Sequence, residues 1–404
     1  MVKDDVLFAW WSLSSVQGIG NVALNKIREQ LASCDDLLEC SAQDLILFGL
    51  KAELAHKWAE SNTLEKLATS SAHNLFLLSS WTKIQQWCQQ PDCGLLLPSD
   101  PNYPDALGVL RDAPIFLFYR GNPQLLRDNS IAIVGSRNPT HYGREQAFLI
   151  AQQLITADWH VISGLAIGVD GEAHKGAMHN STGIGQGKTI AVLGSGLAEI
   201  YPKKHQELAE QIVAAGGVLL SEYLPDEKAL AQNFPRRNRI VSGMSRGTLV
   251  IEAAIKSGSL ITARLAAEQG REVFALPGAV VNPLSRGCHQ MIKEGAHLIE
   301  GAADILALLN SDLAIDMRQA EGDHQQDMFT QHGNSVSNVK PKPKPKPMVE
   351  GVAQQIYLAL DVVPTAIDTL VHRTGLSVAE ISQQLMLMEL KGQVCQVPGG
   401  YVRS

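Results

Sequence analysis

Three features that would assign this chain to a familiar class of protein are missing. Its six cysteines are scattered without a Cys-X-X-Cys pair, so the sequence suggests neither a zinc knuckle nor a disulfide framework. No apolar run approaches the length of a membrane helix, and Met1–Asp5 lacks the charge and apolar pattern of a signal peptide. We therefore expect a cytoplasmic protein with reduced thiols, no metal site and no membrane partner.

An excess of basic residues is also missing. The formal net charge is −7 at pH 7, which argues against a protein that coats nucleic acid with its whole surface. Positive charge gathers instead in the window 228–251, which holds Lys228, Arg236, Arg237, Arg239 and Arg246 and no acidic residue. Any site for a polyanion must therefore be local, and this window is the first candidate.

The central part of the sequence indicates an α/β fold. Between residues 131 and 309, short apolar runs alternate with helix-length segments, which predicts βαβ units and an extended Rossmann-like parallel sheet covered on both faces. The runs are 131–135, 159–164, 189–196, 217–222, 247–251 and 272–278. Several end in glycine, and ligands of such sheets bind at the carboxyl ends of the strands. The preceding run, Pro114–Gly121, is expected to be an edge strand. We assign residues 93–310 to this domain.

Residues 1–92 show a helical pattern and are expected to form a small domain resembling SAM and helix-hairpin-helix modules. The stretch Ser15–Ala23 resembles a helix-hairpin-helix turn, whose glycines expose backbone N–H groups to a DNA phosphate, and Phe48–Lys51 resembles a degenerate second copy. Few basic residues flank either turn. A packing hairpin and a DNA contact therefore both stay open.

The chain after residue 310 is expected to contain a linker and a small domain. Residues 311–348 are polar and include a strict Lys-Pro alternation, which is typical of a semi-rigid polyproline spacer. Residues 349–404 suit a winged helix with a terminal hairpin. Its predicted recognition helix, Val378–Leu390, carries Glu380 and Glu389 and is followed by Lys391, a poor composition for a DNA groove. We expect this helix to contact protein or to pack.

The segment Ile131–Thr140 predicts a phosphate-binding turn. A buried strand leads into Gly135, where the absence of a Cβ lets a phosphate approach the backbone, and Thr140 can cap the helix that begins near Tyr142. Helix-start amides point outward there, and Arg137 adds a fork of donors suited to a phosphate. An ordinary strand-to-helix turn is the alternative for this segment taken alone.

Three other motifs are weaker. Gly194–Glu199 has a glutamate where a dinucleotide fingerprint has its third glycine, so NAD is not expected. Asp170, His174 and His179 lack the further ligands of a metal shell, and structural or capping roles are favoured. Ser245–Glu252 resembles the GT…E turn of the lysine-decarboxylase-like phosphoribohydrolases, but Met244–Arg246 replaces their Pro-Gly-Gly run. A nucleotide-shaped pocket is therefore favoured over hydrolysis.

The run Gln232–Arg239 is the most informative one for partners. Phe234 offers a stacking face for a base, and the three arginines that follow offer forks for a phosphate backbone. Single-stranded nucleic acid requires this pairing of chemistries. A solvated helix start is the alternative, and the absence of nearby acids in an acidic chain favours the binding role.

Taken together, several motifs are similar to those of the DNA-processing protein A family (DprA, also called Smf). They occur in order along the central domain: Gly135–Arg137, Ser163–Gly164, Gly168–Asp170, Ala173–His174, Gly194–Leu197, Tyr201–Pro202, Phe234–Arg239, Ser257–Ala263, Leu276–Gly278 and Gly287–His289. The resemblance implies a non-enzymatic protein without a cofactor that binds single-stranded DNA without sequence preference. It also implies a homodimer that hands the strand to the RecA recombinase in natural transformation.

By this resemblance Arg137 and the arginines after Phe234 would grip phosphates, Phe234 would stack on a base, and the Gly194–Leu197 turn would form a wall of the pocket. The predicted nucleic-acid-binding residues are Gly135, Ser136, Arg137, Gly164, Gly194, Ser195, Gly196, Leu197, Phe234, Arg236, Arg237, Asn238 and Arg239. Two rival functions stay open, a nucleotide N-glycosidase acting in the same pocket and a winged-helix regulator that binds duplex DNA.

Overall fold

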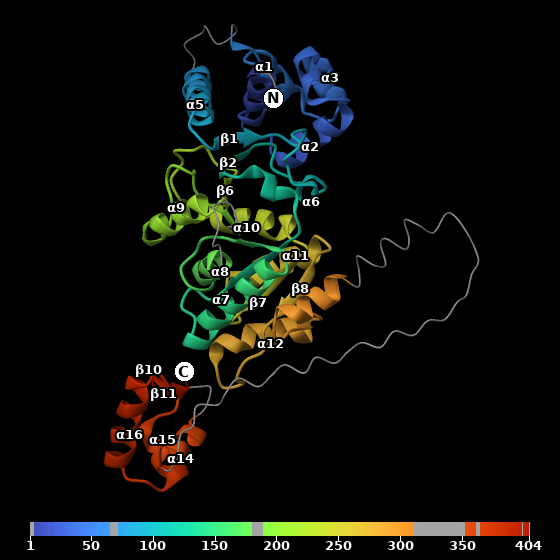
Figure 1. The fold of residues 1–404 in the computed structure, drawn as a ribbon. Helices are drawn as coiled ribbons and strands as arrows, with labels where there is room; N and C mark the ends of the chain where they lie inside the picture. The colour runs from blue at the N-terminus through green and yellow to red at the C-terminus, as the bar shows by residue number, and fades with distance from the viewer. Residues whose placement is uncertain are drawn as a thin grey trace, which may run out of the picture. The chain divides into compact units, whose positions relative to one another are not determined.

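The computed structural model describes residues 4–64, 72–179, 189–310, 352–360, 364–397 and 399–403, and the chain divides into two compact units, Met1–Ile315 and Asp316–Ser404 (Figure 1). The Lys-Pro linker expected over residues 311–348 lies outside the described residues. Within the described ranges, no helix is both long enough and apolar enough to cross a membrane.

The first unit begins with helices, as the sequence pattern predicts. They are α1 (Asp4–Ser14), α2 (Asn21–Gln30), the 3-10 helix η1 (Cys34–Glu39), α3 (Ala42–Leu47), α4 (Ala52–Ala59) and α5 (Ala72–Cys88). The turn between α1 and α2 holds Gly18 at φ 101°, and the turn between α3 and α4 holds Gly49 at φ 96°. Left-handed backbone of this kind favours glycine. A glycine-containing turn between two helices is therefore present at both predicted positions.

A sheet follows, with nine strands among the described residues. Its strands are β1 (Cys93–Leu96), β2 (Leu117–Gly121), β3 (Ser130–Gly135), β4 (His160–Ser163), β5 (Thr189–Val192), β6 (Val218–Ser221), β7 (Gly247–Ile251), β8 (Glu272–Ala275) and β9 (His297–Leu298). They lie in the order β1-β2-β6-β5-β4-β3-β7-β8-β9, and the seven strands from β6 to β9 in this order are parallel. The predicted Rossmann-like parallel sheet is confirmed. Its order reverses between β3 and β7, where ligands of such sheets bind.

Helices cover both faces of the sheet. They are α6 (Asp105–Gly108), α7 (His141–Thr156), α8 (Val169–Met178), α9 (Gln206–Ala214), α10 (Asn233–Met244), α11 (Ser259–Glu268), α12 (Arg286–Lys293) and a last helix at 302–310, joined by short 3-10 turns at Pro123–Arg127, Lys203–His205 and Pro283–Ser285. Alternate residues of β3 point to opposite faces: Ile131 and Ile133 pack with α7 and α8, and Ala132 and Val134 with α10 and α11. A buried apolar run is what such a strand requires.

The edge of the sheet differs from our expectation. The predicted edge strand Pro114–Gly121 forms β2, which lies second in the sheet, antiparallel to β6 on one side and to β1 on the other. The prediction was wrong because Cys93–Leu96 pairs antiparallel with Leu117–Arg120 and so occupies the backbone hydrogen-bonding side that β2 would expose at an edge. The short run Cys93–Leu96 forms the edge instead.

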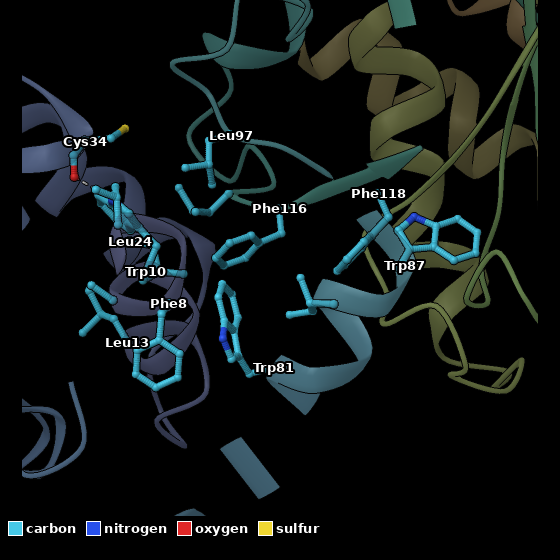
Figure 2. Packing of buried hydrophobic residues seen from close by; sticks show 14 of the residues in the cluster. Phe8, Trp10, Leu13, Leu24, Cys34, Trp81, Trp87, Leu97, Phe116 and Phe118 are labelled. Carbon is cyan, nitrogen blue, oxygen red and sulfur yellow. Dashed lines mark hydrogen bonds between the residues drawn. The ribbon is translucent and has the colours of Figure 1, made fainter. Parts of the chain in front are cut away.

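One hydrophobic core joins the helices at the start of the chain to the sheet. Figure 2 shows Phe8 and Trp10 of α1 and Trp81 of α5 gathered beside Phe116 and Phe118, which lie at the start of β2. The same cluster extends to Leu208 and Ile212 of α9. The predicted boundary between residues 92 and 93 therefore crosses a continuous core, which holds the two hairpin turns in place beside the sheet.

The second unit contains α14 (Val352–Ala359), α15 (Ile367–Thr374), α16 (Val378–Leu390) and the hairpin β10 (Val394–Val397) and β11 (Gly400–Arg403). The predicted helix Val378–Leu390 is confirmed residue for residue. Ser377 and Glu380 form a capping box at its start. The carboxylate of Glu380 is therefore used to cap the helix. The exposed face of α16 carries Met386 and Leu390, which are 67% and 78% exposed.

Candidate nucleic-acid interface

The carboxyl ends of β3, β4 and β7 open into a crevice with a volume of about 710 Å³. The crevice is lined by the loops after these strands and by the first turns of α10 and α11. Among its lining residues are Gly135, Ser136, Arg137, Gly164, Phe234, Arg237, Asn238, Lys256, Ser257, Gly258 and Ser259. It coincides with the reversal point of the strand order. Seven of the thirteen predicted binding residues thus meet in one place.

Gly135 allows β3 and β7 to approach each other at the floor of this crevice. A Cβ at this position would overlap the carbonyl oxygen of Ile251 and meet Val169 at 2.7 Å. The predicted cap follows directly, because Thr140 accepts a hydrogen bond from the amide of Gly143 at 3.1 Å at the start of α7. The predicted strand, helix start and cap are confirmed. The structure gives Gly135 a reason in strand packing rather than in open space for a phosphate, and phosphate binding at this turn stays a prediction.

Two cations at the crevice lack a partner among the described residues. Arg137 follows β3 and Lys256 precedes α11, and both side chains are exposed. In the part of the chain that the structure describes, neither makes an ion pair or a side-chain hydrogen bond. Unpaired guanidinium and ammonium groups that face one crevice raise the local concentration of anions there. This arrangement suits a phosphate chain.

Arg237 lines the same crevice in a different role. It is only 5% exposed, and its Nη1 donates to the carbonyl of Gly164 at 2.7 Å and to the carbonyl of Val192. Burial lowers the pKa of Arg237 to about 10, and nearby Asp170 opposes this effect. The guanidinium therefore stays charged at neutral pH. It ties the ends of β4 and β5 together and adds a buried positive charge to the crevice lining.

Asp170 is the acidic counterpart of Arg237. Its carboxylate accepts hydrogen bonds from the amides of Gly164 at 3.1 Å and Ala166 at 3.3 Å, at the start of α8. Burial raises the pKa of Asp170, while Arg237 acts in the opposite direction. The structural, capping role favoured from the sequence fits these contacts. Its neighbour on the same helix, His174, is fully buried and bonded to Thr189 at 2.8 Å.

An aromatic pair borders the crevice. Phe234 is half-buried at the start of α10, and its ring centroid lies 5.5 Å from that of Tyr201, which is 49% exposed. Gly194 lies behind the pair, since a Cβ there would sit 3.1 Å from Phe234. Two aromatic faces beside unpaired cations provide both surfaces that single-stranded nucleic acid uses.

The Gly194–Leu197 turn supports the crevice from behind. Ser195 donates to the carbonyl of Glu199 at 2.7 Å, the amide of Gly196 donates to the carbonyl of Glu227 at 2.7 Å, and Leu197 is 1% exposed. The turn places Phe234 and leaves Ser195, Gly196 and Leu197 away from the crevice lining. The resemblance implied that these three residues contact the ligand directly. The geometry favours an indirect role, because none of them lines the crevice.

The arginines of α10 do not act as one group, which corrects our expectation. Arg237 faces the crevice, but Arg236 and Arg239 face a second groove on the other side of the helix. Arg239 is 12% exposed and paired with Glu222 at 2.6 Å and Asp112 at 3.3 Å. The expectation failed because a helix turns about 100° per residue, so neighbouring arginines point to different faces.

The glutamate of the GT…E turn is committed to structure. Glu252 is 5% exposed, and its carboxylate accepts from the amide of Thr140 at 2.7 Å and from its hydroxyl at 2.6 Å. It is absent from the lining of the crevice. A carboxylate held in this way is badly placed to act on a bound nucleotide, which weakens the hydrolase alternative further. Among the described residues, no group of His, Cys, Asp or Glu could hold a metal ion.

Sequence reasoning missed two contributors to the crevice. Tyr201 belongs to one of the family motifs, but no role was predicted for it from the sequence. Its signal was an aromatic residue followed by proline in a loop that begins with glycines. Lys256 and Ser257–Ser259 come from the loop before α11. Their only signal was the family motif that begins at Ser257, because nothing in the local pattern places this loop opposite Arg137.

Fold and site together define an open α/β protein with a crevice, lined by exposed cations and bordered by an aromatic pair, at the reversal point of its sheet. Comparison with known families gives a more specific answer. The family model for DNA recombination-mediator protein A matches residues 94–310, and the model for the DprA winged helix domain matches residues 340–400. This chain belongs to the DNA recombination-mediator protein A (DprA/Smf) family, a family of DNA-processing proteins.

Individual relatives agree with this assignment. Protein Smf of Escherichia coli is 39% identical over 317 residues, which are 78% of this chain and 79% of that protein. DNA processing protein DprA of Streptococcus pneumoniae is 45% identical over 208 residues, 52% of this chain and 71% of that protein. The X-ray structure of the Streptococcus pneumoniae protein superposes with a TM-score of 0.62 at 33% identity and covers 76% of this chain and 98% of that one.

Proposed function

We propose that this protein binds single-stranded DNA along the crevice without sequence preference, as a non-enzymatic step of DNA processing in natural transformation. The observation that carries the proposal is the convergence of two unpaired cations, Arg137 and Lys256, with the aromatic pair Tyr201 and Phe234 at one crevice. The cations would hold the sugar-phosphate chain, and the rings would stack on bases. Every base has an aromatic face, so such contacts do not select a sequence.

The test is fluorescence anisotropy with labelled single-stranded and duplex oligonucleotides at several salt concentrations. We expect Arg137→Ala and Lys256→Ala each to lower single-strand affinity by about 10-fold, because each removes a charge-assisted contact. The slope of log affinity against log salt should fall by about 0.7 for each phosphate that the variant no longer neutralises. Lys57→Ala, an exposed lysine on α4 that lines neither groove, is the matched control. Equal affinity of wild type and both variants would overturn the proposal.

A nucleoside monophosphate hydrolysis assay, run beside the binding assay, addresses the N-glycosidase alternative. Hydrolysis by the wild type that disappears in Glu252→Gln would favour that alternative. We expect no hydrolysis, because both oxygens of the Glu252 carboxylate are bonded to Thr140. Stronger binding of duplex than of single strand would favour the winged-helix regulator. The exposed apolar face of α16 leads us to expect the opposite preference.

We further infer that the protein acts as a homodimer and delivers the bound strand to RecA. Membership of a family described as recombination mediators supports this inference. Sedimentation velocity over a range of protein concentrations tests the dimer. The rate of RecA filament formation on a strand already bound by this protein tests the delivery, and a rate lower than that on the naked strand would contradict it.

A further inference from the structure

A second groove, of about 700 Å³, lies where the helices at the start of the chain meet the sheet domain. Both hairpin turns open into it, at Gly18–Ala23 and at Phe48–Leu50, and α10 contributes Arg236 and Arg239 from the opposite side. We call it the hairpin groove. The proposed function does not use it, nor does it use the two turns that the sequence singled out.

Helix α10 lies between the crevice and the hairpin groove. Phe234, Arg237 and Val241 follow one face at helical spacing and line the crevice. Arg236 and Arg239, three residues apart, line the hairpin groove on another face. The exposed side chain of Arg236 lies one residue before the crevice residue Arg237.

The free charge of the hairpin groove is positive. Arg239 pairs with both of its acids, Glu222 at 2.6 Å and Asp112 at 3.3 Å, and the three cations of the lining exceed these two acids by one charge. Lys26 and Arg236, by contrast, are exposed and have no ion-pair partner within the described ranges. Two unpaired cations that line one groove raise the local concentration of anions there, which suits a polyanion.

The turns add neutral donors to these cations. Helix α2 begins at the groove with Gly20 as its N-cap and has no side-chain cap. The amide of Ala23 donates to the carbonyl of Gly20 at 2.9 Å, which leaves the amides of Asn21 and Val22 as the donors at this helix start. Amides at a helix start favour an anion. Two aromatic residues, Phe48 and Tyr223, are half-buried in the same groove. Its chemistry thus repeats that of the crevice, with unpaired cations, backbone amides and aromatic faces.

The groove is held in shape by contacts across the two parts of the unit. Asn21 donates to Glu222 at 2.5 Å, which ties the first hairpin turn to the end of β6. Asn25 donates to the carbonyl of Ala113 at 2.8 Å. The core of Figure 2 packs α1 and α5 against the start of β2. Such a groove does not need to be assembled when a ligand arrives, which lowers the cost of ordering.

We propose that the hairpin groove is a second phosphate-binding segment for the same single DNA strand. The strand leaves the crevice, crosses α10 at Arg236 and contacts Lys26 and the amides at the start of α2. This inference rests on the proposed function and extends the footprint of the strand from the sheet domain to the helices at the start of the chain. Duplex DNA or an acidic peptide in the groove is the competing outcome.

The test compares two lengths of oligothymidylate, about 6 and about 16 nucleotides, within the range of site sizes of single-strand-binding folds. The short probe fills the crevice alone, and the long one reaches both grooves. We expect Lys26→Ala and Arg236→Ala each to weaken the long probe by about 10-fold and to reduce its salt slope by about 0.7, with the short probe unchanged. Arg137→Ala should weaken both lengths.

Lys57→Ala on α4 is again the matched control, and thermal unfolding confirms that Lys26→Ala and Arg236→Ala are folded. If wild type and the two variants bind the long probe equally while the short probe binds normally, the inference fails and the proposed function stands. A wild-type protein that binds neither probe would defeat the proposed function itself. A loss confined to duplex or to an acidic peptide would assign the groove to that competing ligand and overturn the inference.

Discussion

Glu252 holds Thr140 through both oxygens of its carboxylate, at 2.7 Å from the amide and 2.6 Å from the hydroxyl. The two residues come from the end of β7 and the start of α7, on the two sides of the strand-order reversal. Thr140 also ends the loop that carries Arg137. The carboxylate therefore fixes the loop from which the leading candidate for a phosphate contact projects.

We expect Glu252→Ala to lower the free energy of unfolding by about 3 kcal/mol, because it removes two hydrogen bonds to a charged acceptor at a helix start. Glu252→Gln keeps one acceptor oxygen and should cause about half of that decrease. Chemical denaturation measures both. Equal stability of Glu252→Ala and wild type would contradict the structural role of this carboxylate.

A second prediction concerns Gly135. In Gly135→Ala the new methyl group meets the backbone of Ile251, which cannot move without disturbing the β3–β7 pairing, so we expect the free energy of unfolding to fall by about 3 kcal/mol. The matched control is Gly258→Ala. Gly258 lines the same crevice, and a methyl group added there would meet only open space. Its stability should be unchanged or raised by up to about 1 kcal/mol. Similar melting temperatures for the two variants would argue against the close approach at Gly135.

A third prediction concerns the aromatic pair. Phe234→Ala should weaken single-strand binding by about 5-fold to 100-fold, the range typical of losing one stacked base, and Phe234→Tyr should retain most of the affinity. Tyr142→Ala, which removes an exposed aromatic from α7 outside the crevice lining, serves as control. Filter binding at low salt measures all three. Full affinity in Phe234→Ala would remove base stacking from the proposal.

A fourth prediction follows from the burial of His174. Burial lowers the pKa of His174 to about 3 from its usual value of 6.5, so the folded protein holds this ring neutral where the unfolded chain protonates it. The stability due to this residue is therefore present above pH 6.5 and is lost as the pH falls from 6.5 toward 3. At pH 5 the loss should be about 2 kcal/mol, at about 1.4 kcal/mol for each pH unit.

The matched variant is His174→Asn, whose amide can still bond Thr189 and does not titrate. Its stability should fall less steeply than that of wild type between pH 7 and pH 5, and the difference should be about 2 kcal/mol. Denaturation at both pH values gives the comparison. Parallel curves for the two proteins would mean that His174 is not held neutral in the fold.

Local patterns were enough to predict the sheet. The run Ile131–Val134 is apolar at every position because both faces of β3 are covered, and Thr140 caps α7 because a threonine before a helix can accept from its free amides. Strand order and the position of β2 required tertiary information. A short, proline-flanked run such as Leu95–Pro98 gives no sign of which neighbour it will pair with.

Site residues were predictable only where they follow a strand directly. Arg137 was found because it comes two residues after Gly135 at the end of β3. The pairing of Arg239 with Glu222 could not be predicted, because its partner lies 17 residues away on another element. Helical spacing, applied within 234–239, would have separated Arg237 from Arg236 and Arg239. Tyr201 reaches Phe234 only through the folding of two loops against each other.

The core that joins the first helices to β2 limits where the chain can be shortened without loss of folding. A chain that began at residue 93 would present Phe116 and Phe118 to water, without the tryptophans that now cover them. Shortened forms of this kind should be recovered as aggregates, and a fragment that ends before β1 should fare no better. The two parts can therefore be expected to change together in evolution, with substitutions on one side answered by substitutions on the other.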